Sequence, residues 1–309
     1  DYPFNCNLDL KSLAATYNTA NNELDISWLK PTDAENPGVT EYDVEWAWID
    51  EGATDRYMSG SNYVQEWLFT NNSSRVSISE SGYKIPMLYD DEGRVFVRVR
   101  PVQVTTNGQR IEGRWTWIAN DVNQPEMSAS PVFYEFDGHE ALLNWQASTS
   151  FAEEGKRKSV VQYFDGSLRS RQTVTKDNTS NTTVVAESFY DYQGRAVIQV
   201  LPSPTLSTAI AYAKNFNRAP GEMEYPKTLY DKLAGNAGIC GNPASPFHTD
   251  FGTAKYYSPK NPSVSDGVNK YIPDATAGNP DQGYAFTETR LSPDGRIASQ
   301  GGVGANYQL

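Results

Sequence analysis

The chain has 309 residues, of which 38% are hydrophobic, and its mean hydropathy is −0.60. It carries 38 acidic against 26 basic residues, a formal net charge of −12, which argues against a nucleic-acid partner because phosphates would be repelled. No apolar run approaches the roughly 20 residues that a membrane-spanning helix needs. We therefore expect no nucleic acid and no membrane insertion, and the length predicts two structural units.

The first third of the chain has the pattern of half-buried strands. Apolar residues alternate with polar ones over 24–28, 42–48 and 95–100. A period of two places one face of a strand in a core. Asn107-Gly108, a typical hairpin turn, lies between two further apolar stretches. Strands of this kind need a second layer, so the sequence predicts an all-β fold with two packed sheets.

Three stretches of this region carry a family resemblance. LDISWLKP from residue 24, EYDVEWAWID from residue 41 and GRVFVRVRPV from residue 93 resemble strands B, C and F of a fibronectin type III domain. The resemblance implies a fibronectin type III-like β-sandwich over residues 1–122. It departs from the family at Val95, which occupies the position of the strand F tyrosine, and at 51–79, which we interpret as an insertion.

A second region follows a polar stretch. Residues 123–131 contain one proline and no periodicity, and we interpret them as a linker. Asp137-Gly138 then lies between two apolar segments, 132–136 and 139–145, which predicts a hairpin with a solvated His139 beside its turn. The second region is expected to run over residues 132–309.

The rest of this region is predicted to be mostly hairpins. Residues 158–176, 182–201 and 285–300 each have the pattern of a strand, a turn and a strand. Between the last two lies a loop segment, 202–283, rich in Pro, Gly, Asn and Ser. Its one helical pattern begins at Pro226 and ends before Gly235.

The three hairpin turns share a motif. The turn from Tyr190 to Arg195 has the form Y-D-x-x-G-R, and two degenerate copies start at Phe164 and Leu291. The residues that make up the motif in the three turns are Phe164, Asp165, Arg169, Tyr190, Asp191, Gly194, Arg195, Gly295 and Arg296. An Asp at a turn accepts hydrogen bonds from nearby amides, and Gly supplies a positive φ. The Arg begins the returning strand, where its stem can lie along an aromatic ring. A similar stretch at Tyr89–Arg94 is interpreted as a corner of the sandwich.

This motif resembles the YD (RHS) repeats of very large secreted bacterial proteins. YFDGSLRSRQTV, FYDYQGRAVIQVLP and RLSPDGRIASQ are the stretches that carry the resemblance. It implies hairpins that form part of a β-sheet shell in a secreted or cell-surface protein. Members of that family enclose polymorphic toxins or act as adhesins, and the analogy extends to export by type IX secretion. The function expected on this basis is a non-catalytic structural segment, with the remainder of the parent protein as its partner.

Two alternative functions rest on other residues. A carbohydrate- or surface-binding module would use exposed aromatic side chains, and Trp48 and Trp67 are the strongest candidates. A hydrolase would be centred on His248 and Asp250, because an Asp can orient a histidine base. No G-x-S-x-G serine motif accompanies that pair.

The sequence offers little support for a bound metal. Cys6 and Cys240 have no neighbouring histidine pair, so a structural zinc site is not expected. We interpret them as two separate thiols, with a disulfide as the alternative. Asp177, Asp266 and Asp294 lie in loops that could hold Ca²⁺ weakly, but no calcium-loop motif is present and no cofactor is expected.

Overall fold

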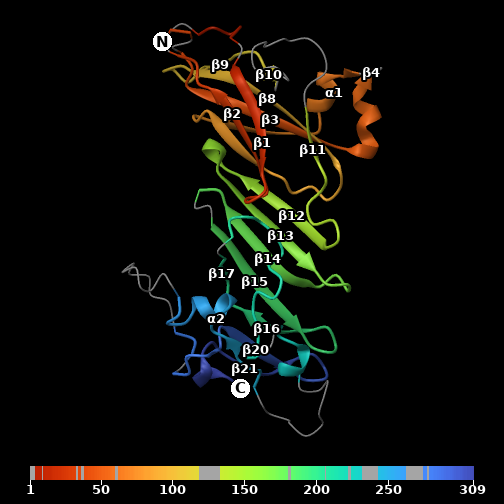
Figure 1. The fold of residues 1–309 in the computed structure, drawn as a ribbon, viewed down its shortest axis with the longest axis vertical. Helices are drawn as coiled ribbons and strands as arrows, with labels where there is room; N and C mark the ends of the chain where they lie inside the picture. Colours follow the sequence, from red (N-terminus) through yellow and green to blue (C-terminus); the bar gives the residue numbers. More distant parts are fainter. Residues whose placement is uncertain are drawn as a thin grey trace. The chain divides into compact units, whose positions relative to one another are not determined.

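The computed structural model consists mainly of antiparallel strands, which confirms the predicted all-β fold (Figure 1). It divides into two compact units. Unit 1 comprises residues 1–142 and 149–158, and unit 2 comprises 143–148 and 159–309. The structure describes all residues except 1–3, 9, 33, 36–37, 60–61, 118–132, 180–181, 206, 222–223, 232–242, 262–273 and 277. The predicted linker at 123–131, Cys240 and Asp266 lie outside the described residues.

The described residues of unit 1 form two large sheets and one small two-stranded sheet. The first has the strand order β1-β2-β7, and the second has the order β10-β8-β3-β6, with β9 and β11 also paired to β8. The strands of the first sheet are β1 (Lys11–Asn18), β2 (Glu23–Leu29) and β7 (Gly82–Pro86). Those of the second are β3 (Glu41–Asp50), β6 (Ser73–Ile78), β8 (Gly93–Val104), β9 (Arg110–Glu112), β10 (Thr116–Trp117) and β11 (Phe133–Phe136).

The core of unit 1 lies between these sheets. It takes the apolar residues of the period-two stretches, including Ile26 and Trp28 from β2 and Val44 and Trp46 from β3. Both tryptophans are at most 5% exposed. Val95, at the position of the family tyrosine, is fully buried in the same core. Apolar area removed from water at about 25 cal/mol per Å² is the main stabilising contribution of such a sandwich.

The predicted insertion at 51–79 is partly a strand of the sandwich. Residues 73–78 form β6, which pairs with β3 from Tyr42↔Ile78 to Ala47↔Ser73. Before it come a 3-10 helix η1 (Glu51–Tyr57), short strands β4 (Met58–Ser59) and β5 (Asn62–Tyr63), and helix α1 (Gln65–Phe69). Leu68 and Phe69 of α1 pack with Phe96 in a small second core. The residues outside the sheet are therefore 51–72.

The predicted hairpin around Asp137-Gly138 is wrong. β11 pairs with β8 instead, with Phe133 opposite Phe96 and Phe136 opposite Gly93. His139, expected in solvent, is 4% exposed, and its N–H donates to the carbonyl of Tyr89 (2.7 Å). The long strand β8 offers a free backbone edge at 93–96 for β11. Pairing with this distant strand replaces the local hairpin that Asp137-Gly138 indicated. Residues 133–142 consequently belong to unit 1.

Unit 2 is built on one large sheet with the order β12-β13-β14-β15-β16-β20-β21, and β17 also pairs with β15. Its strands are β12 (Asn144–Phe151), β13 (Arg157–Phe164), β14 (Ser170–Asp177), β15 (Thr182–Tyr190), β16 (Ala196–Val200), β17 (Ser203–Pro204), β20 (Phe286–Leu291) and β21 (Ile297–Gly301). The end of the β12–β13 hairpin, which carries the 3-10 helix η2 (Glu153–Gly155), belongs to unit 1.

The segment 202–283 supplies short elements that pack within unit 2. They are η3 (Lys227–Leu229), β18 (Phe247–His248), α2 (Gly252–Tyr256) and β19 (Gln282–Gly283), and η5 (Ala305–Tyr307) lies near the C-terminus. An aromatic cluster of Phe189, Tyr225, Tyr230, Phe247 and Phe286 forms the core. Where a helix was predicted after Pro226, the described residues form one 3-10 turn that ends before Tyr230.

Candidate functional site

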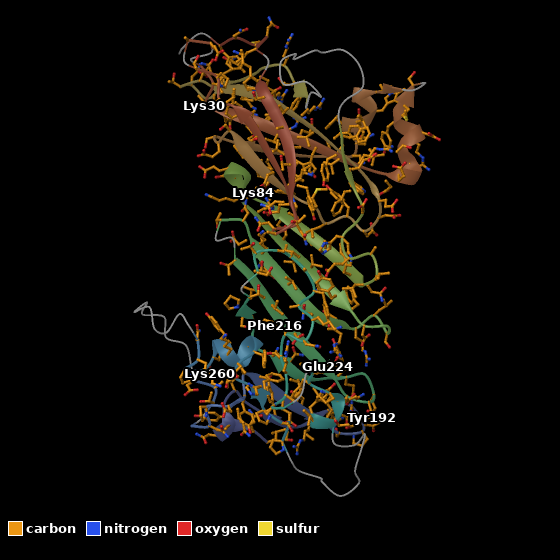
Figure 2. The ribbon with its side chains drawn as sticks, in the orientation of Figure 1. Lys30, Lys84, Tyr192, Phe216, Glu224 and Lys260 are labelled. Carbon is orange, nitrogen blue, oxygen red and sulfur yellow. The ribbon has the colours of Figure 1, made fainter. Side chains whose placement is uncertain are left out.

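The turn between β15 and β16 is held by one carboxylate. Asp191 Oδ1 accepts the N–H groups of Gln193 and Arg195, both at 2.9 Å, and Oδ2 accepts Arg195 Nε at 2.7 Å. Gly194 has φ +81°, and its N–H donates to the carbonyl of Asp191 (3.0 Å). Tyr192, which belongs to this turn, is labelled in Figure 2. One Asp thus satisfies two amides and one guanidinium in a six-residue corner.

The turn between β13 and β14 repeats this arrangement. Asp165 Oδ1 accepts the N–H groups of Ser167 (2.8 Å) and Arg169 (3.1 Å), and Oδ2 accepts Arg169 Nε (2.8 Å). Leu168 occupies the position of the glycine with φ +58°, a conformation that costs a β-carbon-bearing residue roughly 1 kcal/mol. The same geometry therefore forms without glycine, at some cost in strain.

The turn between β20 and β21 keeps the backbone bonds but loses the central carboxylate. Ser292 stands in place of the Asp, and its N–H donates to the carbonyl of Arg296 (2.8 Å). Gly295 has φ +82°, as the motif requires. Asp294 lies at the tip instead and is 3.3 Å from Arg296 Nε, on side chains that are mostly exposed. This corner is held mainly by its backbone.

Each complete turn also contacts the turn that follows it in the sheet. The Arg169 guanidinium lies over the ring of Tyr190 at 5.0 Å, and the Tyr190 hydroxyl donates to the carbonyl of Ser170 (2.8 Å). Arg195 Nη1 in turn donates to the carbonyl of Ser292 (2.9 Å). The three corners are therefore joined through their arginines, in the order of their strands. We call this set of contacts the turn ladder.

The arginines also set the ionisation of the turn carboxyls. Burial acts to raise the pKa of Asp191, but the backbone N–H and guanidinium of Arg195 outweigh it and lower the pKa below its usual range. The pKa of Asp165 is lowered in the same way, against burial, by Arg169. Both groups are hence ionised acceptors at neutral pH.

Unit 1 has a second charged arrangement, across the outer face of β3, β6 and β8. Asp43 accepts hydrogen bonds from Arg100 Nε (2.8 Å) and Ser77 Oγ (2.6 Å) and pairs with Arg110. Burial acts to raise the pKa of Asp43, but these partners outweigh it and the pKa is lowered. Glu45 accepts Arg75 (3.0 Å) and pairs with Arg98. Both carboxylates are at most 2% exposed.

Aromatic rings cover the arginines of this face. Arg98 lies between the rings of Phe69 (4.1 Å) and Trp115 (4.2 Å), and Arg100 is 4.4 Å from Trp115. Our sequence interpretation missed this network. The sequence did contain a signal. Acids occupy alternate positions 43 and 45 in one predicted strand, and arginines occupy alternate positions 98 and 100 in another, so the two sets would face each other if the strands were paired. Glu41 and Glu112 pair with Arg110 and Arg100 at the border of this network, so four acids balance four arginines. The network therefore stabilises the sheet rather than presenting a charged surface.

The two tryptophans of the binding-module alternative are not brought together. Trp48 lines a pocket of about 290 Å³ with Asn71, Asn72 and Tyr89. Its ring is stacked on Tyr89 (4.1 Å, 3° between planes), and its indole N–H donates to Asp50 (2.6 Å). Trp67 is 49% exposed on α1 and does not line this pocket. Tyr89 thus occupies one face of the Trp48 ring.

His248 and Asp250 have the geometry of a turn. His248 Nδ1 accepts the backbone N–H of Asp250 (3.1 Å) and lies 3.6 Å from Asp250 Oδ2. The Asp250 carboxylate instead binds Lys260 Nζ (2.8 Å), which also contacts Asp281 (3.0 Å). An Asp that orients a histidine base accepts the Nδ1 proton, and this bonding pattern is the reverse.

The described residues contain no group of three or more His, Cys, Asp or Glu side chains that could hold a metal ion. Asp177, one of the loop acids considered for Ca²⁺, accepts the N–H (2.8 Å) and hydroxyl (2.6 Å) of Thr179. Cys6 is an exposed free thiol. Within the same part of the chain, no helix has both the length and the apolar character to cross a membrane.

Comparison with known families gives one match. Residues 140–236 match a family described as a domain of unknown function, DUF6443. The matched range includes β12 to β17 and the two complete turns at Asp165 and Asp191. No curated protein matches the chain.

Proposed function

We propose that this chain is a non-catalytic structural segment of a large secreted or cell-surface bacterial protein with YD repeats. It serves as scaffold or shell wall, and the observation that carries the proposal is the turn ladder. Arg169 contacts the ring of the second turn, and Arg195 contacts the carbonyl of the third. Contacts that run from one hairpin to the next are what a sheet built from stacked hairpins requires, because a single hairpin is marginal in water.

The last hairpin supports the same proposal. β21 is the final strand of the sheet order, and residues 297–300 are exposed. The Arg296 side chain is 88% exposed, whereas Arg169 and Arg195 are 34% and 23% exposed. An edge strand carries unpaired backbone groups that favour the addition of another strand. The partner at this edge is the remainder of the parent protein.

The chemistry of the motif residues fits a structural role. Both oxygens of Asp165 and Asp191 are used by amides and by an arginine of the same corner. A carboxylate used in this way is not available as a base or nucleophile. The wider role of the parent protein that we propose is adhesion or toxin delivery after export, with type IX secretion as the route.

Hydrogen exchange tests the ladder directly. Arg195→Lys removes the planar guanidinium that bonds the Asp191 carboxylate and the Ser292 carbonyl at the same time. A lysine ammonium is a compact charge that lacks this forked geometry. We expect faster exchange of the amides in the Ser292–Arg296 turn as well as in the Asp191 turn. The matched control is Arg296→Lys, whose side chain is mostly exposed and which should leave the Asp191 turn unchanged. Loss of protection confined to the Asp191 turn would argue against stacked repeats.

The location of the protein tests the second half of the proposal. An antibody raised against this chain should label intact cells of the producing organism, or detect the protein in the medium. Brief protease treatment of intact cells should remove the surface signal. Protection from protease until the cells are lysed would refute a secreted or surface location.

A further inference from the structure

Unit 1 has an open strand edge beside a groove. β6 pairs with β3 on one side and is the last strand in its sheet order. In an antiparallel strand, alternate residues direct their N–H and C=O groups away from the paired neighbour. Among the described residues, no strand pairs with β6 on its other side, and η2 lies beside it within the same unit. Residues 73–78 thus present a row of backbone donors and acceptors about 20 Å long.

The groove between β6 and η2 has a volume of about 580 Å³. Residues 75–79 form one wall, and Phe151, Ala152, Glu153 and Glu154 lie along the other side. All of these residues belong to unit 1. The open edge therefore lies at a concave surface, where an added strand would contact side chains on both of its sides.

Two large apolar side chains line this groove while remaining partly in solvent. Val104 is 40% exposed and Phe151 is 43% exposed. The inner part of Phe151 packs edge-on against Trp46, with ring centroids 5.9 Å apart. Its position is consequently fixed by the core, and its outer surface is available for an apolar side chain of a ligand.

The charge of the groove is negative. Glu41, Glu153 and Glu154 line it together with Arg75. Glu41 pairs with Arg110 (2.7 Å) and Glu154 pairs with Lys156 (3.0 Å), so the negative charge of the groove rests mainly on Glu153. Arg75 binds the buried Glu45 (3.0 Å) and lies over Trp115 (5.2 Å). Exposed Glu153 makes no ion pair with any residue that the structure describes. A basic ligand gains attraction here, and an acidic one is repelled.

We propose that this groove binds an extended, basic peptide segment of another protein, which adds to β6 as a further strand. Backbone hydrogen bonds to β6 supply affinity, and side chains at alternate positions supply specificity. Apolar side chains of the segment contact Phe151 and Val104, and lysine or arginine side chains reach Glu153 and Glu154. A second copy of this chain is a poor occupant, because each copy carries a net charge of −12.

A titration with synthetic peptides tests this site in the full chain. The probe is a short fluorescent peptide in which lysine and valine alternate, and anisotropy reports binding. Phe151→Ala and Glu153→Lys should each weaken binding by about tenfold. A peptide N-methylated at alternate residues loses the donors for β6 and should not bind. A peptide of alternating glutamate and valine should not bind either.

The matched controls lie on the same unit outside the groove. Leu142→Ala removes a fully exposed apolar side chain, and Glu92→Lys makes the same charge change as Glu153→Lys. Both should leave binding unchanged. Because Glu153→Lys alters only an exposed residue, it keeps the test valid even if Phe151→Ala perturbs the core. The proposal is overturned if the basic peptide fails to bind at millimolar concentration, or if the controls weaken binding equally. Sedimentation that shows dimers broken by Glu153→Lys would also overturn it.

Discussion

Charged residues stabilise the two units in different ways. In unit 1, Asp43 and Glu45 are held between strands by arginines that lie 57 and 53 residues further along the chain. In unit 2, Asp165 and Asp191 are held by arginines only four residues away. The first arrangement fixes which strands are neighbours. The second fixes a corner. Its arginine also contacts the next turn, through the Tyr190 ring for Arg169 and through the Ser292 carbonyl for Arg195.

This difference predicts where a lost charge does most harm. A carboxylate buried between strands leaves several cations without a partner when it is removed, whereas a turn carboxylate leaves one cation near solvent. Six of the seven tryptophans lie in residues 1–142, so tryptophan fluorescence reports mainly on unit 1. Amide hydrogen exchange can report on the turns of unit 2.

The largest effect is expected for Glu45→Ala. Glu45 is 2% exposed and pairs with Arg75 and Arg98, which would keep their charges but lose this buried carboxylate. We expect the free energy of unfolding of unit 1 to fall by about 3 kcal/mol in a urea titration followed by tryptophan fluorescence. The control Glu35→Ala removes an exposed ion pair with Lys11 and should not shift the transition measurably. Equal effects of the two changes would contradict the stabilising role assigned to the buried ion pairs of unit 1.

Asp191→Ala should have the next largest effect. It removes the acceptor for two amides and one guanidinium, and hydrogen bonds to charged groups contribute about 2 kcal/mol. Hydrogen exchange of the β15 and β16 amides should accelerate accordingly. Asp294→Ala, at the exposed tip of the third turn, should have little effect on its own hairpin. A larger loss at Asp294 than at Asp191 would contradict the assignment of the central carboxylate.

Two smaller effects of opposite sign on stability are expected at the positive-φ position of the turns, which Leu168 and Gly194 occupy. Leu168→Gly relieves the strain at φ +58°, and Leu168 is 74% exposed, so little packing is lost. Stability should rise by about 0.5–1 kcal/mol. Gly194→Leu should lower it by a similar amount, since φ is +81° there and a new Cβ would lie 2.8 Å from Arg169 Nη1. Thermal melts of both variants decide whether the two corners are equivalent.

The smallest effect concerns pH. The pKa of folded Asp191 is lowered, with burial opposing and Arg195 prevailing, so the unfolded chain takes up the proton first as pH falls. The stability this group contributes is present above the unfolded pKa, about 3.9, and is lost as pH falls through the folded pKa. Asp191→Asn removes this dependence. The difference in unfolding free energy between wild type and variant should shrink below about pH 4, and a constant difference would contradict an ionised Asp191.

Local chemistry explains what the sequence could predict. The corner at Asp191 depends on residues within six positions, and the side-chain types alone indicate which groups can bond. The buried faces of β2, β3 and β8 follow from a period of two. The pairing of β11 with β8 was missed because it joins residues about forty positions apart, where an Asp-Gly turn gave a strong but incorrect local signal.

The other features that the sequence did not predict also depend on contacts between residues far apart in the chain. β6 was assigned to an insertion, since nothing local distinguishes Ser73–Ile78 from a loop that carries a few apolar residues. The stacking of Tyr89 on Trp48, which covers one face of the indole ring, likewise joins distant residues. Burial in that contact raises the pKa of Tyr89 to about 12. Long-range pairings decide both features.

The composition of unit 1 has a consequence for any fragment of this protein. The sandwich includes residues 149–158, and Arg157 from that segment binds Glu23 in a pair whose side chains are 3% and 4% exposed. Arg157 also bonds the carbonyl of Lys84, and Tyr83 donates to the carbonyl of Gly155 (3.3 Å). A gene truncated after residue 142 would encode Glu23 without its cation. A fragment that keeps the sandwich with its buried charges paired must therefore extend to residue 158, although the compact part of the chain before it ends at residue 142.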